Sequence, residues 1–160
     1  MKKLFGLFIL VLLLSTSIIA ADLISYDKKL KSNGKNVMFI LGSKNCPYCE
    51  VLKKDINTNK ELSSLIKGKM NVYYIPIDEQ LDYEIGDKTP AVKTTSLSLK
   101  MQFGSRVTPT VVMFNNKWER IIQLPGYADP KQMKSFLKYL NNDIYKNKDL
   151  GEYLKEEGIL

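Results

Sequence analysis

The two cysteines of this chain, Cys46 and Cys49, are separated by two residues and follow the apolar run 37–41. A pair at this spacing can act as a redox dithiol, contribute to a zinc site, attach a haem or form a structural disulfide. A zinc site needs four Cys or His ligands, and the 160-residue chain has no histidine and no third cysteine. Covalent haem attachment requires a histidine directly after the second cysteine, where this sequence has Glu50.

A redox dithiol is the interpretation that the spacing favours. A structural disulfide across two residues would stabilise the fold only slightly, because so short a loop removes little entropy from the unfolded chain. Redox chemistry gains from the short span, since the second thiol is always in place to resolve a mixed disulfide. Pro47 suits the first turn of a helix, which places Cys46 at the positive end, where a thiolate is stabilised. Cys46 is the expected nucleophile and Cys49 the resolving thiol, with a small favourable contribution from the charge of Lys44.

The N-terminal segment has a separate task. Lys2 and Lys3 precede an apolar run over residues 4–14, followed by small and hydroxyl-bearing residues. This pattern predicts a signal peptide over residues 1–20 and a location in the periplasm or at the cell exterior. An uncleaved inner-membrane anchor is the alternative, because bulky Ile18 weakens the cleavage site and the apolar character nearly reaches the span of about 20 residues that a bilayer requires.

The remaining chain has the length of one domain. We expect this domain over residues 21–145 and a helical tail over residues 146–160. Removal of the signal segment takes away two lysines and no acid, which lowers the formal net charge from +7 to +5. The basic residues are spread along the chain, and the cluster at 28–31 is most simply a solvated face, so no nucleic-acid partner is expected.

Hydrophobic periodicity and turn residues predict an α/β order that ends in an antiparallel pair of strands. The tail carries Leu150, Tyr153 and Leu154 at helical spacing, which favours an amphipathic helix that packs on the domain. The expected elements begin with a helix over 22–33, a buried strand over 37–41, a helix from the motif, a second helix around 62–66 and a strand over 70–78. Residues 79–94 are expected to form a long loop or an inserted segment. A short helix over 96–103, strands over 110–114 and 118–124 around a turn at 115–117, and a helix capped by Asp129 with Pro130 in its first turn complete the order.

The order of these motifs resembles the thioredoxin superfamily over about residues 35–140. A strand leads to Cys46-Pro47-Tyr48-Cys49 at a helix start, and Arg106-Val107-Thr108-Pro109-Thr110 leads into an apolar strand, a hairpin and a closing helix. The resemblance implies a three-layer fold with a central mixed sheet flanked by helices. It also implies a cis peptide between Thr108 and Pro109, before the edge hairpin and facing the sulfurs.

The same resemblance assigns roles to individual residues. Pro109 would pack near the nucleophile and exclude metal, and the backbone of Thr108 would pair with an extended substrate. The loop Pro125-Gly126-Tyr127 would lie on the other side of the substrate groove, where the glycine admits close approach of a backbone. Pro47 and Tyr48, between the cysteines, would contact the substrate, and Tyr48 is expected to be exposed.

Within the superfamily, the motif, the loop 124–127 and the helical stretch 136–140 most resemble exported thioredoxin-like proteins of the SoxW type. One departure concerns proton transfer. Thioredoxins have a buried acid six positions before the first cysteine, where this chain has Ile40. Proton transfer would then use water or another group, with Asp78 and Glu50 as candidates.

The favoured function is reduction of protein disulfides by a monomer, without cofactor or metal. A disulfide oxidase or isomerase is the alternative enzyme, and a non-catalytic thioredoxin-fold binding module is the alternative from another class. Expected partners are protein thiols and disulfides and a protein that recycles the pair, for which a membrane-embedded protein is one option. Glutaredoxins share the tetrapeptide, but their Thr-Val-Pro loop and Gly-Gly turn are absent from this sequence, so no glutathione dependence is expected.

Overall fold

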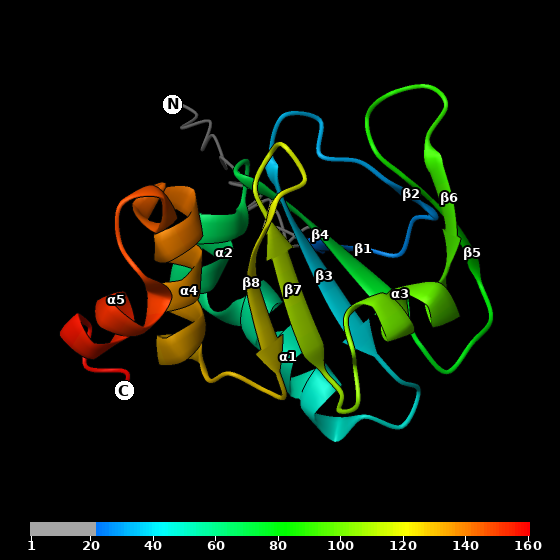
Figure 1. Cartoon of the computed structure of the whole chain (residues 1–160). Coiled ribbons are helices and arrows are strands. Elements are labelled where there is room, and N and C mark those ends of the chain that lie inside the picture. Colours follow the sequence, from blue (N-terminus) through cyan, green and yellow to red (C-terminus); the bar gives the residue numbers. More distant parts are fainter. Residues whose placement is uncertain (1–21) are drawn as a thin grey trace, which may run out of the picture.

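The computed structural model describes residues 22–160, and the predicted signal segment over 1–20 lies outside them. Over the described residues, a five-stranded mixed sheet forms the centre of the fold (Figure 1). Three strands are parallel, and the last two are antiparallel to their neighbours. In spatial order the strands are β1 (Ile24–Ser25), β4 (Met70–Pro76), β3 (Asn36–Gly42), β7 (Thr110–Phe114) and β8 (Arg120–Pro125).

Strand β3 is central because both of its faces are covered. Residues 37–41 are at most 1 % exposed, as expected for a continuous apolar run inside a sheet. Phe39 lies in one hydrophobic core, and Ile40 lies in the core on the opposite face. The strands predicted over 37–41, 70–78 and 110–114 are confirmed.

Helices α1 (Pro47–Thr58), α2 (Lys60–Ile66) and α4 (Pro130–Asn141) cover the face of Ile40. Helix α1 buries Cys49, Leu52 and Ile56, whose spacing places them on one side of a helix. Asp129 caps α4 as predicted, and its side chain and that of Gln132 form a reciprocal capping box.

The C-terminal tail packs on the domain, as predicted. A 3₁₀ turn (Ile144–Lys146) leads to α5 (Leu150–Glu156), whose Tyr153 and Leu154 are each 6 % exposed. The ring of Tyr153 lies 5.3 Å from that of Tyr139 on α4. No helix between residues 22 and 160 has the length and apolar character that a membrane crossing requires.

A second, small sheet and helix α3 (Ser96–Gln102) cover the face of Phe39. The small sheet consists of β2 (Lys29–Leu30), β5 (Asp82–Ile85) and β6 (Val92–Thr95). Of the two alternatives for residues 79–94, the long loop was wrong, because β5 and β6 form an antiparallel hairpin there. Its alternating pattern is too short to detect, and burial of Tyr83 against the second core stabilises the hairpin.

The prediction of an N-terminal helix over 22–33 was also wrong. That segment forms β1 and β2, which pair in parallel with β4 and β5. A helix of twelve residues is marginal by itself, whereas the open edge of β4 supplies hydrogen bonds to Ile24 and Ser25. The returning strand β8 begins at Arg120 rather than at residue 118, because a bulge and a left-handed Trp118 (φ 67°) extend the turn.

Candidate active site

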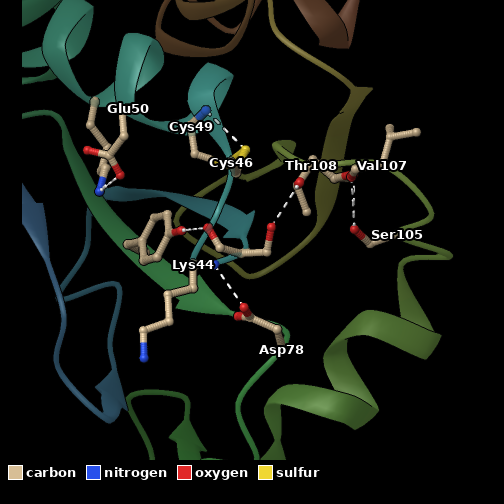
Figure 2. Close-up of a disulfide and its surroundings, with 12 residues drawn as sticks. Lys44, Cys46, Cys49, Glu50, Asp78, Ser105, Val107 and Thr108 are labelled. Carbon is tan, nitrogen blue, oxygen red and sulfur yellow. Dashed lines mark hydrogen bonds and ion pairs between the residues drawn. A yellow bond between two sulfur atoms is a disulfide. The ribbon is translucent and has the colours of Figure 1, made fainter.

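The two cysteines lie where α1 begins, after a short loop that leaves β3 at Gly42. They form a disulfide with 5.2 Å between their Cα atoms. Cys46 is the N-cap residue of α1, and its Sγ accepts a hydrogen bond of 3.1 Å from the backbone N–H of Cys49 (Figure 2). As the sequence predicts, Pro47 occupies the first turn of this helix.

The two cysteines differ in exposure. Cys46 is 6 % exposed, whereas Cys49 is completely buried among the apolar residues of α1 and the central sheet. The positive end of α1 and the N–H of Cys49 would both stabilise negative charge on the Cys46 sulfur after reduction. The arrangement is therefore suited to attack by Cys46, and its role as nucleophile stays a prediction.

The loop before β7 lies beside the cysteines. Its Thr108–Pro109 peptide is cis, and the hydroxyls of Thr108 and Ser43 lie 3.2 Å apart. The carbonyl of Pro109 accepts a hydrogen bond of 2.8 Å from the N–H of Gly126. The φ of Gly126 is +86°, a left-handed conformation that favours glycine. The fold thus gathers Thr108, Pro109 and Gly126, which are far from the motif in sequence, while their assignment to substrate binding stays a prediction.

The two sides of the motif carry different side chains, with an exposed apolar residue on one side and an ion pair on the other. Figure 2 shows Thr108 and Val107 on one side of the cysteines and Glu50 on the other. Val107 is 47 % exposed. Glu50 forms an ion pair of 2.6 Å with Lys53.

Tyr48 projects from the motif and is 61 % exposed. Its ring stacks on the ring of Tyr127, with 5.9 Å between centroids and 25° between planes. The Tyr127 hydroxyl donates a hydrogen bond of 2.7 Å to Asp55 Oδ2 on α1. Burial, together with this hydrogen bond and the negative charge of Asp55, raises the pKa of Tyr127 to about 12, so that the hydroxyl keeps its proton at neutral pH.

The region around Ile40 is apolar. Ile40 is fully buried, pairs with Tyr74 on β4 and Val111 on β7, and belongs to the same core as both cysteines. The Tyr74 hydroxyl donates a hydrogen bond of 3.2 Å to the carbonyl of Ser43. Burial raises the pKa of Tyr74, although the charge of Lys53 acts in the opposite direction.

Neither carboxylate considered for proton transfer takes the buried position of the thioredoxin acid. Asp78 is exposed and accepts a hydrogen bond of 2.8 Å from the backbone N–H of Lys44, and Glu50 is exposed in its ion pair with Lys53.

Among residues 22–160 there is no group of three or more side chains of the metal-ligating types that could hold a metal ion.

Sequence reasoning missed two residues of this site, Ser43 and Asp55, and it predicted Tyr127 only as part of the loop on the far side of the groove. Their contacts join positions far apart in sequence: Ser43 and Thr108 are 65 positions apart, and Asp55 and Tyr127 are 72 positions apart. The resemblance placed Tyr127 in the groove loop, but nothing in the sequence indicated its stack on Tyr48 or its hydrogen bond to Asp55. No local pattern distinguishes Asp55 from other acidic residues on the face of a helix.

Fold and site together define a thioredoxin-fold protein with a Cys-x-x-Cys disulfide at the start of a helix. The family model of the thioredoxin-like domain matches residues 26–141, and the chain belongs to this family. This membership indicates thiol-disulfide redox chemistry on protein thiols and disulfides, as is general among thioredoxin-fold proteins.

Solved structures agree with the fold. A thioredoxin-fold protein from Helicobacter pylori is 28 % identical, with a TM-score of 0.77 over 88 % of this chain and 91 % of that chain. A thioredoxin-like protein from Clostridium perfringens is 17 % identical, with a TM-score of 0.52 over 86 % and 98 % of the two chains. A mutant thioredoxin from Halobacterium salinarum is 18 % identical, with a TM-score of 0.50 over 73 % and 94 %. No curated protein sequence matches the chain.

Proposed function

We propose that this protein is an exported protein-disulfide reductase in which Cys46 attacks and Cys49 resolves. In the reduced protein, the Cys46 thiolate attacks one sulfur of a substrate disulfide. A Cys46–substrate disulfide forms, and the other substrate sulfur leaves as a thiolate that takes up a proton. Cys49, after losing its proton, then attacks Cys46 and releases the second substrate thiol. The substrate gains two electrons and two protons, and the protein is left with the Cys46–Cys49 disulfide.

The difference between the two sulfurs carries this assignment. Cys46 caps α1 and keeps a small exposed surface, whereas Cys49 is fully buried one turn further along. A substrate disulfide can therefore approach Cys46 only, and Cys49 is held where it can attack that mixed disulfide. The hydrogen bond from the N–H of Cys49 to Cys46 Sγ would also stabilise the attacking thiolate.

Export rests on the sequence over residues 1–20, with its two lysines and apolar run. In an oxidising compartment the dithiol needs a partner that returns it to the reduced state. A membrane-embedded thiol protein would supply electrons from inside the cell. We further propose that the protein acts as a monomer of the SoxW type, an assignment that rests on the resemblance of the motif and of the loop 124–127.

Insulin reduction by dithiothreitol tests the proposal. The purified protein should accelerate precipitation of insulin chains, and Cys46→Ser should abolish the acceleration. If wild type and Cys46→Ser are equally inactive, the proposed enzymatic function is wrong. The alternative is then favoured, a binding module whose groove holds peptides without catalysing a reaction.

The alternative direction is disulfide donation, as by an oxidase. The interactions that stabilise a Cys46 thiolate also stabilise the reduced state, which makes the disulfide more oxidising. The reduction potential decides between the two directions. A value near about −270 mV supports the reductase, and a value near about −120 mV supports the oxidase.

A further inference from the structure

The loop after β8 is hydrogen-bonded both to the loop before β7 and to the motif helix α1. On one side, the N–H of Gly126 donates to the carbonyl of Pro109 at 2.8 Å. On the other side, the hydroxyl of Tyr127 donates to Asp55 of α1 at 2.7 Å. The first bond holds the backbone of this loop beside Pro109, and the second holds the Tyr127 ring at α1.

The fixed ring supports Tyr48. The two rings stack at 5.9 Å with 25° between their planes, which restrains the side chain of Tyr48 although 61 % of its surface is exposed. A large aromatic side chain that is both exposed and held in place offers apolar contact area at a small entropic cost. Since Tyr48 lies between the two cysteines, a chain whose disulfide reaches Cys46 must pass beside it.

We propose that Tyr48 and Tyr127 form a docking platform for a substrate residue adjacent to the attacked cysteine, and that Asp55 is a positioning residue for this platform. The partner is a polypeptide with an aromatic or long apolar side chain at that position. This inference rests on the proposed function, because the platform serves a substrate disulfide that reacts at Cys46.

The exposed surface around the platform matches this partner. Val107 is 47 % exposed on the loop that leads into Thr108. An extended chain that pairs with the backbone of Thr108 would therefore meet apolar groups from two separate elements, Val107 on one and Tyr48 on the other. Aromatic and aliphatic side chains are those whose burial against such surfaces is favourable.

The test compares two disulfide-linked peptide dimers that differ only in the two residues that flank the cysteine, both phenylalanine in one dimer and both glycine in the other. The second-order rate constant of the pre-reduced protein with each dimer is measured by chromatography of the released peptide thiol. We expect wild type to favour the phenylalanine dimer by about fivefold or more, because an aromatic contact changes a barrier by about one kcal/mol, or a factor of about five.

Asp55 variants separate positioning from general stability. Asp55→Ala removes the acceptor of the Tyr127 hydroxyl and should lower the preference to about twofold or less. Asp55→Asn keeps an acceptor oxygen and should retain the preference. Tyr127→Phe removes the same hydrogen bond from the other partner and should behave like Asp55→Ala, which guards against misfolding of a single variant.

Tyr139→Phe is the matched control, because the Tyr139 hydroxyl donates a hydrogen bond of similar length, 2.6 Å, to the carbonyl of Lys148 away from the motif. This variant should keep the wild-type preference. Equal rates of wild type with both dimers, or an unchanged preference in Asp55→Ala and Tyr127→Phe, would overturn the platform while leaving the reductase intact. A wild type that reduces neither dimer would overturn the proposed function, and the platform with it.

Discussion

Asp87 is expected to anchor the small sheet to the rest of the fold, and its replacement by Asn should destabilise the protein in a pH-dependent way. Its carboxylate accepts four hydrogen bonds: from the N–H and Oγ of Ser32 at 2.9 and 2.6 Å, from the N–H of Asn33 at 2.9 Å, and from Nε1 of Trp118 at 2.9 Å. Asp87 follows β5, so these bonds join the hairpin to the segment before β3 and to the β7–β8 turn. Asp87→Asn retains one acceptor oxygen and loses the charge.

The expected decrease in the free energy of unfolding of Asp87→Asn follows from the pKa of Asp87. Burial acts to raise this pKa, but the hydrogen bonds from Ser32, Asn33 and Trp118 outweigh it and lower the pKa from 3.8 to about 2. A shift of this size corresponds to at most about 2.5 kcal/mol. Because Asp87 is exposed and water screens its charge, we expect about 1 kcal/mol.

The direction of the pKa shift sets the pH range over which Asp87 stabilises the fold. A carboxylate whose pKa is lower in the folded state stabilises that state above its unfolded pKa, and the contribution is lost as the pH falls through the folded value. The difference in the free energy of unfolding between wild type and Asp87→Asn should therefore be full at pH 7 and decline between about pH 4 and pH 2.

Urea denaturation at pH 7, 4 and 2.5 measures this difference, with the fluorescence of Trp118, the only tryptophan, as one probe and far-UV circular dichroism as another. Asp82→Asn is the control, because Asp82 is exposed in the same hairpin and its carboxylate accepts no hydrogen bond from residues 22–160. A difference that stays constant from pH 7 to pH 2.5, or that equals the effect of Asp82→Asn, would show that the charge of Asp87 does not stabilise the fold through these hydrogen bonds.

Three further predictions concern the motif, the core and the tail. Cys49→Ser should accumulate a mixed disulfide with substrate peptide, visible by mass spectrometry, whereas Cys46→Ser should form none; trapping by both variants would contradict the order of attack. Ile40→Asp should lower the free energy of unfolding by about 3–5 kcal/mol, because Ile40 is fully buried. The control Ile40→Val should lower it by about 1 kcal/mol, and similar losses in the two variants would show that the site tolerates a polar group. Leu154→Ala should lower the free energy of unfolding by about 2–3 kcal/mol, because Leu154 is buried, and the melting temperature by roughly 5–10 °C in a thermal scan. An unchanged melting temperature would mean that α5 contributes nothing to stability.

Patterns within one element predicted the main layers of the fold. The apolar run 37–41 forms a strand buried on both faces, and Pro47 and Pro130 lie in the first turns of α1 and α4. These predictions succeed because the signals are local. A proline restricts its own backbone, and a continuous apolar run is stable only where both faces of a strand are covered.

The predictions for residues 22–33 and 79–94 differ from the structure because their local signals are weak and pairing with neighbouring strands determines their conformation. Leu23, Tyr26 and Leu30 have helical spacing, yet the open edge of β4 draws residues 24–25 into a strand. Residues 82–85 and 92–95 are too short and too polar to indicate strands, and they pair because Tyr83 is buried against the second core. Strand formation depends on partners that a linear pattern does not contain.

The class of chemistry could be predicted from local sequence, since two cysteines separated by two residues, with no histidine, leave redox exchange as the favoured use of the pair. The sequence also indicated that the position of the usual buried acid is Ile40. The side chains that meet around the motif could be identified only in the folded protein: the hydroxyls of Ser43 and Thr108, and the stack of Tyr48 on a Tyr127 held by Asp55. Such contacts join separate elements, so their geometry depends on how the elements pack rather than on the residues next to them in the chain.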